Sequence, residues 1–152
     1  YGYESFSAGN DRKVIYLDNI NFSFIPLICY EIIYSGKVIL KSNKTNFIIN
    51  ISEDGWFGDS IGPHQHFSHT IFRAIEEGKN IIRSTNNGIS AYIDSNGIVI
   101  SELESTKKGV IELNKYKKFN ETLFSKFGNK IFFYIIIIYI GVIFFIKRRE
   151  LK

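Results

Sequence analysis

The chain has 152 residues, of which 45% are hydrophobic, 22% charged and 16% aromatic. These proportions exclude a globally disordered chain, and a content of 12 glycines, two prolines and one cysteine excludes collagen-like and disulfide-stapled classes. The net charge of +4 lies mostly in the last six residues, 147–152, so the rest of the chain gives no basis for nucleic-acid binding.

The sequence contains no methionine, even at position 1. It also begins without the basic start, apolar stretch and cleavage site of a signal peptide. We therefore expect the chain to be the C-terminal part of a longer protein. Its length predicts one domain.

Short apolar runs separated by turn residues predict strands in the first third of the chain. Residues 14–17 and 22–28 are bounded by Asp18 and Asn19. Residues 47–51 form a nearly continuous apolar run, which is typical of a strand buried on both faces of a sheet. A short helix is expected around residues 32–40.

A longer helix is predicted over residues 65–77, where apolar side chains recur at helical spacing. Pro63 lies near its start and Gly78 is expected to end it. Turns are expected at Asn87-Gly88 and Asn96-Gly97. Strands are expected over residues 81–84, 90–93, 98–103 and 110–113. This succession predicts a mixed α/β fold around a central sheet.

The C-terminal part of the chain is an apolar stretch with a basic end. Residues 131–146 carry no charge, and a helix over 127–146 would rise about 30 Å, the thickness of a bilayer core. We interpret 127–146 as a transmembrane helix, 119–126 as its linker and 147–152 as a cytoplasmic tail, since basic residues favour the inner side. A buried core helix or strand pair is the alternative interpretation.

Cys29 is the one cysteine, and it follows an apolar run and precedes Tyr30 and Glu31. At the end of a buried strand, where a helix begins, backbone N–H groups favour a thiolate and can hold an oxyanion. Glu31 would place a carboxylate beside the thiol. The pattern offers Cys29 as a candidate nucleophile, with an inert buried cysteine as the alternative.

Three histidines, His64, His66 and His69, lie close together but match no standard metal-ligand spacing. His66 and His69 are expected to share a helix face, with His64 in the turn before it. We interpret all three as ordinary polar or core residues and expect no metal site. The lone Trp56 lies in a glycine-flanked loop, which is either a loop that closes over something or a tight structural turn.

Five motifs then follow one another in order. They are Ile28-Cys29-Tyr30-Glu31, residues 50–58 (NISEDGWFG), residues 62–66 (GPHQH), residues 73–76 (RAIE) and residues 83–91 (RSTNNGISA). From about Ser5 onward the chain resembles the C-terminal half of the bacterial apolipoprotein N-acyltransferases, a membrane family of the nitrilase superfamily. It departs from that family at Glu53 and Gly55, where the family usually has Asn and Ala.

The resemblance implies a partial nitrilase-like αββα sandwich over residues 1–118, on the periplasmic side of a bacterial inner membrane. It also implies a Glu-Lys-Cys triad and no cofactor. Cys29 matches the nucleophile, the backbone N–H of Tyr30 contributes to the oxyanion hole, and Glu31 supports the site. The triad Glu and Lys lie upstream in the family, and neither Glu4 nor Lys13 matches their motifs.

The implied activity is N-acylation of the N-terminal diacylglyceryl-cysteine of lipoproteins. A phospholipid would give its acyl group to Cys29 as a thioester, and the lipoprotein amine would then take it. The expected partners are this phospholipid donor, the lipoprotein acceptor and the lipid bilayer, and the isolated chain is expected to be inactive. The alternatives are a membrane-anchored nitrilase-type amidohydrolase and a non-catalytic membrane-anchored interaction domain.

Overall fold

The computed structural model describes residues 12–36, 38, 45, 47–113, 116 and 121–150. Within them, six strands form one mixed sheet in the spatial order β1-β2-β3-β4-β5-β6. The strands are β1 (Ile15–Leu17), β2 (Phe22–Ile28), β3 (Phe47–Ser52), β4 (Asn80–Thr85), β5 (Ser90–Ile93) and β6 (Val99–Leu103). The helices are η1 (Asp18–Ile20), η2 (Cys29–Ile33), η3 (Gly55–Phe57), α1 (Gly62–Glu77), α2 (Leu123–Phe127) and α3 (Lys130–Glu150).

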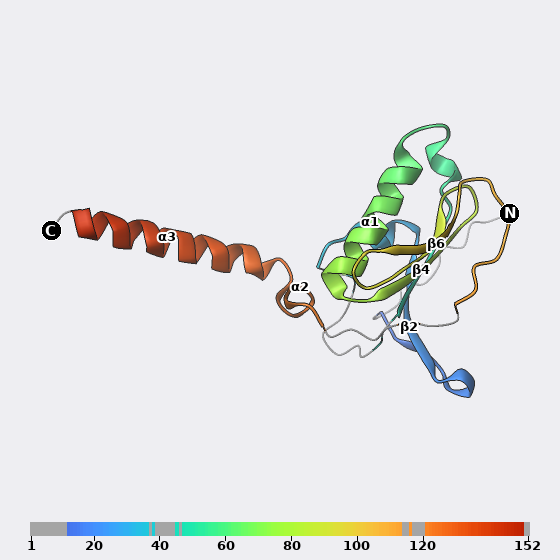
Figure 1. Cartoon of the computed structure of the whole chain (residues 1–152), viewed down its shortest axis with the longest axis horizontal. Coiled ribbons are helices and arrows are strands. Elements are labelled where there is room, and N and C mark those ends of the chain that lie inside the picture. The colour runs from blue at the N-terminus through green and yellow to red at the C-terminus, as the bar shows by residue number, and fades with distance from the viewer. Residues whose placement is uncertain are drawn as a thin grey trace, which may run out of the picture.

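The three central strands run parallel, and hairpins extend the sheet on both sides. β2, β3 and β4 pair in parallel, whereas β1 pairs with β2, β4 with β5 and β5 with β6 in antiparallel register. The α1 helix connects β3 to β4 and covers one face of the sheet (Figure 1). Parallel strands end at the same edge, and in open α/β sheets that edge is where ligands bind.

The core lies between α1 and the sheet. Ile25, Ile48 and Ile81 are neighbours across β2, β3 and β4, and all three are fully buried. Two residues further along the same face, the neighbours are Leu27, Asn50 and Arg83, also buried. The buried face therefore changes from apolar to polar at the carboxyl ends of the parallel strands.

Most predicted elements are confirmed, and two are wrong. The helix expected over residues 32–40 is instead the 3₁₀ helix η2, which begins at Cys29 and ends before Gly36, whose φ is +68°. Residues 37 and 39–40 lie outside the described residues. The strand expected over 110–113 does not form, and this run pairs with no strand of the sheet. The α1 helix begins at Gly62, with Pro63 in its first turn, and ends at Gly78.

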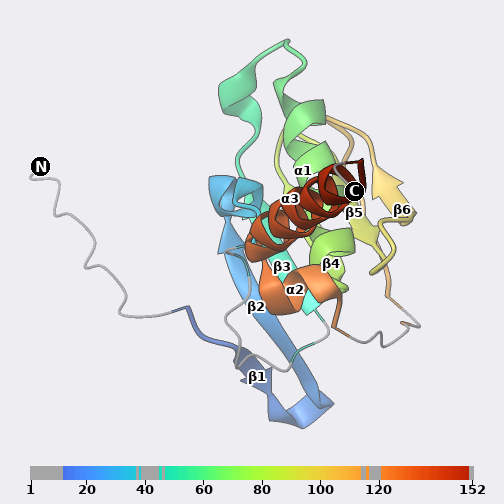
Figure 2. The same ribbon diagram turned by 90° about the vertical axis from the view of Figure 1, so that its left-hand side faces the viewer.

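The C-terminal helix begins later than predicted. The end of the expected linker and the first residue of the expected membrane helix form α2, Leu123–Phe127, and Gly128, with a φ of +55°, ends it. The apolar helix α3 therefore starts at Lys130 and includes the basic residues at its end. By length and composition α3 can cross a membrane. It projects away from the sheet, and its apolar stretch is not buried against the rest of the described chain (Figures 1 and 2).

Candidate active site

Cys29 lies at a strained turn between β2 and η2. It is the first residue of η2, and its φ is +50°. A residue other than glycine in this backbone conformation costs about 1–3 kcal/mol, so its surroundings must hold it there. The nucleophile of an α/β-hydrolase lies at a comparably strained strand-to-helix turn. The predicted position of Cys29, at a strand end where a helix begins, is what the structure shows.

Asn50 holds this turn from the neighbouring strand. Its Nδ2 donates to the carbonyl oxygen of Leu27 at 3.1 Å and to that of Cys29 at 3.4 Å. The Asn50 side chain is fully buried, because β3 places it directly beside Leu27 on the covered face of the sheet. One amide group therefore fixes the backbone on both sides of Ile28.

The guanidinium of Arg83 binds Asn50 from β4. Its Nη1 donates to Asn50 Oδ1 and, at 3.3 Å, to Thr70 Oγ1 of α1. Its Nη2 donates to Asp54 Oδ2 at 2.7 Å. Both partners of this ion pair are fully buried, and a buried charge persists only when it is paired and hydrogen-bonded.

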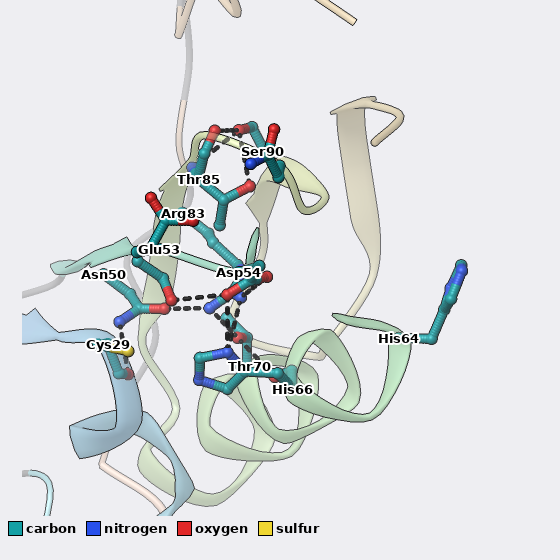
Figure 3. Close-up of polar contacts among 12 residues, drawn as sticks. Cys29, Asn50, Glu53, Asp54, His64, His66, Thr70, Arg83, Thr85 and Ser90 are labelled. Carbon is teal, nitrogen blue, oxygen red and sulfur yellow. Dashed lines mark hydrogen bonds and ion pairs between the residues drawn. The ribbon is translucent and has the colours of Figure 1, made fainter. Parts of the chain in front are cut away.

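Asp54 completes a buried polar cluster, which we define as Asn50, Asp54, His66 and Arg83 (Figure 3). Asp54 Oδ1 accepts from the Ser52 hydroxyl at 2.7 Å and lies 3.0 Å from His66 Nδ1. Burial alone would raise the pKa of Asp54. The hydrogen bonds of His66 and Ser52 and the charge of Arg83 outweigh burial and lower this pKa to about 2.

Gly88 explains one of the predicted turns. A Cβ at this position would overlap the carboxylate of Asp54, so the turn after β4 passes close over the cluster only because the residue is glycine. The chain between β4 and β5 therefore closes one side of the buried polar cluster.

Glu31 braces the other side of the Cys29 turn. Its Oε2 accepts from the backbone N–H of Ile28 at 2.7 Å, and its Oε1 accepts from Arg12 Nη2 at 3.0 Å. The carboxylate thus binds the backbone just before Cys29 and is itself held by a cation. Each of its oxygens accepts one of these hydrogen bonds.

An open cleft of about 490 Å³ lies beside Cys29 at the carboxyl ends of β2, β3 and β4. It is lined by Ile28, Cys29, Ile51, Ser52, Glu53, Ser84, Thr85 and Asn86. The Tyr30 ring borders His66, with centroids 5.3 Å apart. Trp56 is 87% exposed, so its indole is not packed into a tight turn.

The three histidines separate in the structure. All of them lie on α1, but His66 is buried in the polar cluster whereas His64 and His69 are exposed. The prediction that His64 lies in a preceding turn is therefore wrong, because the helix begins at Gly62. His66 and His69 lie three residues apart on α1 as expected, but only His66 is buried. Among the described residues, no group of three His, Cys, Asp or Glu side chains is placed to hold a metal ion.

Sequence reasoning singled out neither Asn50 nor Arg83 as a site residue. The available signal was a polar residue inside each of two apolar runs, Phe47–Ser52 and Asn80–Thr85. Only the register of β3 on β4 shows that these two polar residues are direct neighbours.

The chain is similar to known proteins over most of its length. Residues 3–114 match the carbon-nitrogen hydrolase family. The chain is 42% identical over 130 residues to the apolipoprotein N-acyltransferase of Rickettsia bellii (strain RML369-C), covering 85% of this chain and 26% of that protein. It is 45% identical over 130 residues to that of Wigglesworthia glossinidia brevipalpis, covering 84% and 26% respectively. The chain thus spans about a quarter of the length of these relatives.

Solved structures resemble the fold. A mutant of the amidase from Nesterenkonia sp. AN1, with acrylamide added at its active-site cysteine, superimposes with a TM-score of 0.50 at 15% identity. The match covers 66% of this chain and 41% of that one. These findings confirm the resemblance drawn from the five motifs and the mixed α/β fold class.

The low pKa of Asp54 makes a prediction about acid stability. A carboxylate with a pKa of about 2 in the folded state and 3.8 otherwise stabilises the fold above pH 4, and this contribution is lost as the pH falls toward 2. Urea unfolding of the intact protein should show a loss of about 2 kcal/mol over this window that is absent in Asp54→Asn. The exposed Asp59→Asn should follow the wild type. Parallel curves for wild type and Asp54→Asn would contradict the assignment.

Asn50→Ala should destabilise the intact protein by about 2–4 kcal/mol, because it removes the bonds to two carbonyls and leaves the Arg83 charge short of an acceptor. It should also change the rate at which iodoacetamide alkylates Cys29. The measurements are urea unfolding and quantified alkylation. Asn96→Ala, at an exposed turn position, is the matched control and should alter neither. An Asn50→Ala protein with wild-type stability would refute the role given to this amide.

Proposed function

The chain belongs to the carbon-nitrogen hydrolase family, and from this we propose that it is the C-terminal part of an apolipoprotein N-acyltransferase. The proposal rests on two features that occur together in this chain. A cysteine lies at a strained strand-to-helix turn beside an open cleft, and the same domain leads into an exposed apolar helix of 21 residues. The relatives named apolipoprotein N-acyltransferase support the same reading.

The proposed reaction has two steps. In the first, the thiolate of Cys29 attacks the acyl ester carbonyl of a phospholipid, and the tetrahedral intermediate collapses to a thioester while the lysophospholipid alkoxide leaves and takes a proton. In the second, the α-amine of a lipoprotein diacylglyceryl-cysteine attacks the thioester. An amide forms, and the thiol is released. The backbone N–H of Tyr30 contributes to stabilising the oxyanion in both steps.

The triad Glu and Lys implied by the resemblance would come from the part of the protein that precedes this chain. Glu31 is given no role as the base: its carboxylate binds the backbone N–H of Ile28 and the Arg12 guanidinium. Its role in the proposal is to hold the turn. The isolated chain is therefore proposed to be inactive, and turnover by it alone would refute that point.

The apolar helix α3 fits the lipid nature of both substrates. Its length and composition suit a bilayer, and Lys147, Arg148 and Arg149 at its end favour a cytoplasmic C-terminus. The proposed location is the bacterial inner membrane, with the Cys29 domain on the periplasmic side. A soluble amidase would have no use for this helix.

A pulse–chase experiment tests the proposed function. The full-length protein in membranes receives a phospholipid with a labelled acyl chain, and label on the protein is followed during a chase with an unlabelled lipoprotein acceptor. The proposal predicts hydroxylamine-sensitive label that moves to the lipoprotein N-terminus. It also predicts that Cys29→Ser lowers transfer by about 10³-fold or more, because the nucleophile is lost.

The other outcomes contradict the proposal. Label that leaves only as free fatty acid would indicate the amidohydrolase-type alternative, in which water is the acceptor. Absence of label on a folded protein would indicate a non-catalytic domain in which Cys29 only packs. The variant Ser95→Ala, far along the chain at a turn after β5, controls for nonspecific loss.

A further inference from the structure

The C-terminal end of α1 binds the segment that follows Cys29. Arg73 Nη1 donates to the carbonyl oxygen of Ile33, the last residue of η2, at 3.0 Å. Arg73 Nη2 pairs with Glu76 Oε1 at 2.8 Å, and the Ser35 hydroxyl donates to the same carboxylate at 3.1 Å. Arg73 is only 4% exposed, so this pair holds the far end of η2 from inside the fold.

The same end of α1 also binds the segment that leads into α3. The Thr122 hydroxyl donates to the backbone carbonyl of Glu76. Its oxygen accepts from the Ser125 N–H at 2.9 Å and so caps α2. Glu76 therefore contacts the nucleophile segment through its side chain and the approach to α3 through its backbone.

The two segments also lie close to each other. A Cβ on Gly36, just beyond η2, would lie 3.5 Å from Asn129 Oδ1 and 3.6 Å from the Asn129 backbone nitrogen. A Cβ on Gly128 would lie 3.8 Å from the carbonyl oxygen of Gly36. The loop after η2 thus lies close to the turn between α2 and α3. Figures 1 and 2 show α2 beside the end of α1.

A flexible tether to a membrane needs none of these contacts. Here Glu76 binds both segments, Ser35 through its carboxylate and Thr122 through its backbone carbonyl, and Arg73 binds Ile33 beside it. The two segments also lie close to each other. A displacement of about 1 Å at a reacting group can cost about 10²-fold in rate. A connection that fixes Cys29 relative to α3 therefore affects the rate of reaction with a donor that resides in the bilayer.

Resting on the proposed function, we propose that Arg73 and Glu76 are positioning residues that clamp the Cys29 segment to the base of α3. The clamp sets the position of the thiol relative to the lipid surface that supplies the acyl donor. It acts on the encounter with a bilayer-bound ester and not on the chemistry of the thiol itself. The membrane helix is, on this account, part of the positioning of the site.

Two changes to the full-length protein in phospholipid vesicles test the clamp. One is Glu76→Ala, and the other is an insertion of Gly-Ser-Gly between Gly128 and Asn129, which separates α2 from α3 without altering the core. Acylation of Cys29 is measured with two donors, a vesicle phospholipid and the water-soluble p-nitrophenyl acetate. Glu104→Ala is the matched control, because it breaks an exposed pair of the same i,i+3 spacing, with Lys107 at 2.6 Å.

The clamp predicts that both changes lower kcat with the phospholipid by about tenfold or more. The rate with p-nitrophenyl acetate should stay within about twofold, and Glu104→Ala should affect neither donor. An equal loss with both donors, or no loss with either, overturns the clamp. A wild-type protein acylated by the soluble ester but never by the phospholipid would refute the proposed function, and the clamp with it.

Discussion

The buried charge of Arg83 is the constraint on which the site depends. A fully buried guanidinium costs several kcal/mol unless it is paired and hydrogen-bonded. Here Asn50, Thr70 and Asp54 accept from its two Nη atoms, whereas its Nε has no partner among the described residues. These partners come from β3, α1 and the loop before η3, so one charge fixes the mutual positions of three separate segments. Substituting any one of them leaves a buried charge short of a partner.

The cluster around Arg83 matters because Asn50, which Arg83 holds, also hydrogen-bonds the backbone at Cys29. A positive φ at a cysteine is unfavourable on its own, and it persists here because hydrogen bonds from Asn50 and Glu31 hold the backbone on either side. These hydrogen bonds offset the backbone strain at Cys29, and the one from Asn50 comes from the buried face of the sheet. As a result the thiol stands at the carboxyl ends of the parallel strands, beside the open cleft, and does not pack into the core.

Sequence alone predicted the elements whose signal is local. The strand Phe22–Ile28 was predicted from an apolar run, and the end of α1 from a glycine, Gly78, which has a φ of +61° in the structure. Prediction from the sequence failed for η2, because a 3₁₀ helix of five residues is too short to show a hydrophobic periodicity. The position of Cys29 was predictable, but its support was not. Asn50 and Arg83 are distant in the chain and become neighbours only through strand register.

The most direct test of the account is the identity of the acylated residue. The full-length protein is incubated in vesicles of a phospholipid with one defined acyl chain, digested, and the peptide containing Cys29 is analysed by mass spectrometry. The account predicts that this peptide gains the mass of that acyl chain and loses it on treatment with hydroxylamine. An acyl group found on a different residue, or an unmodified Cys29 in a protein that still transfers acyl groups, would contradict it.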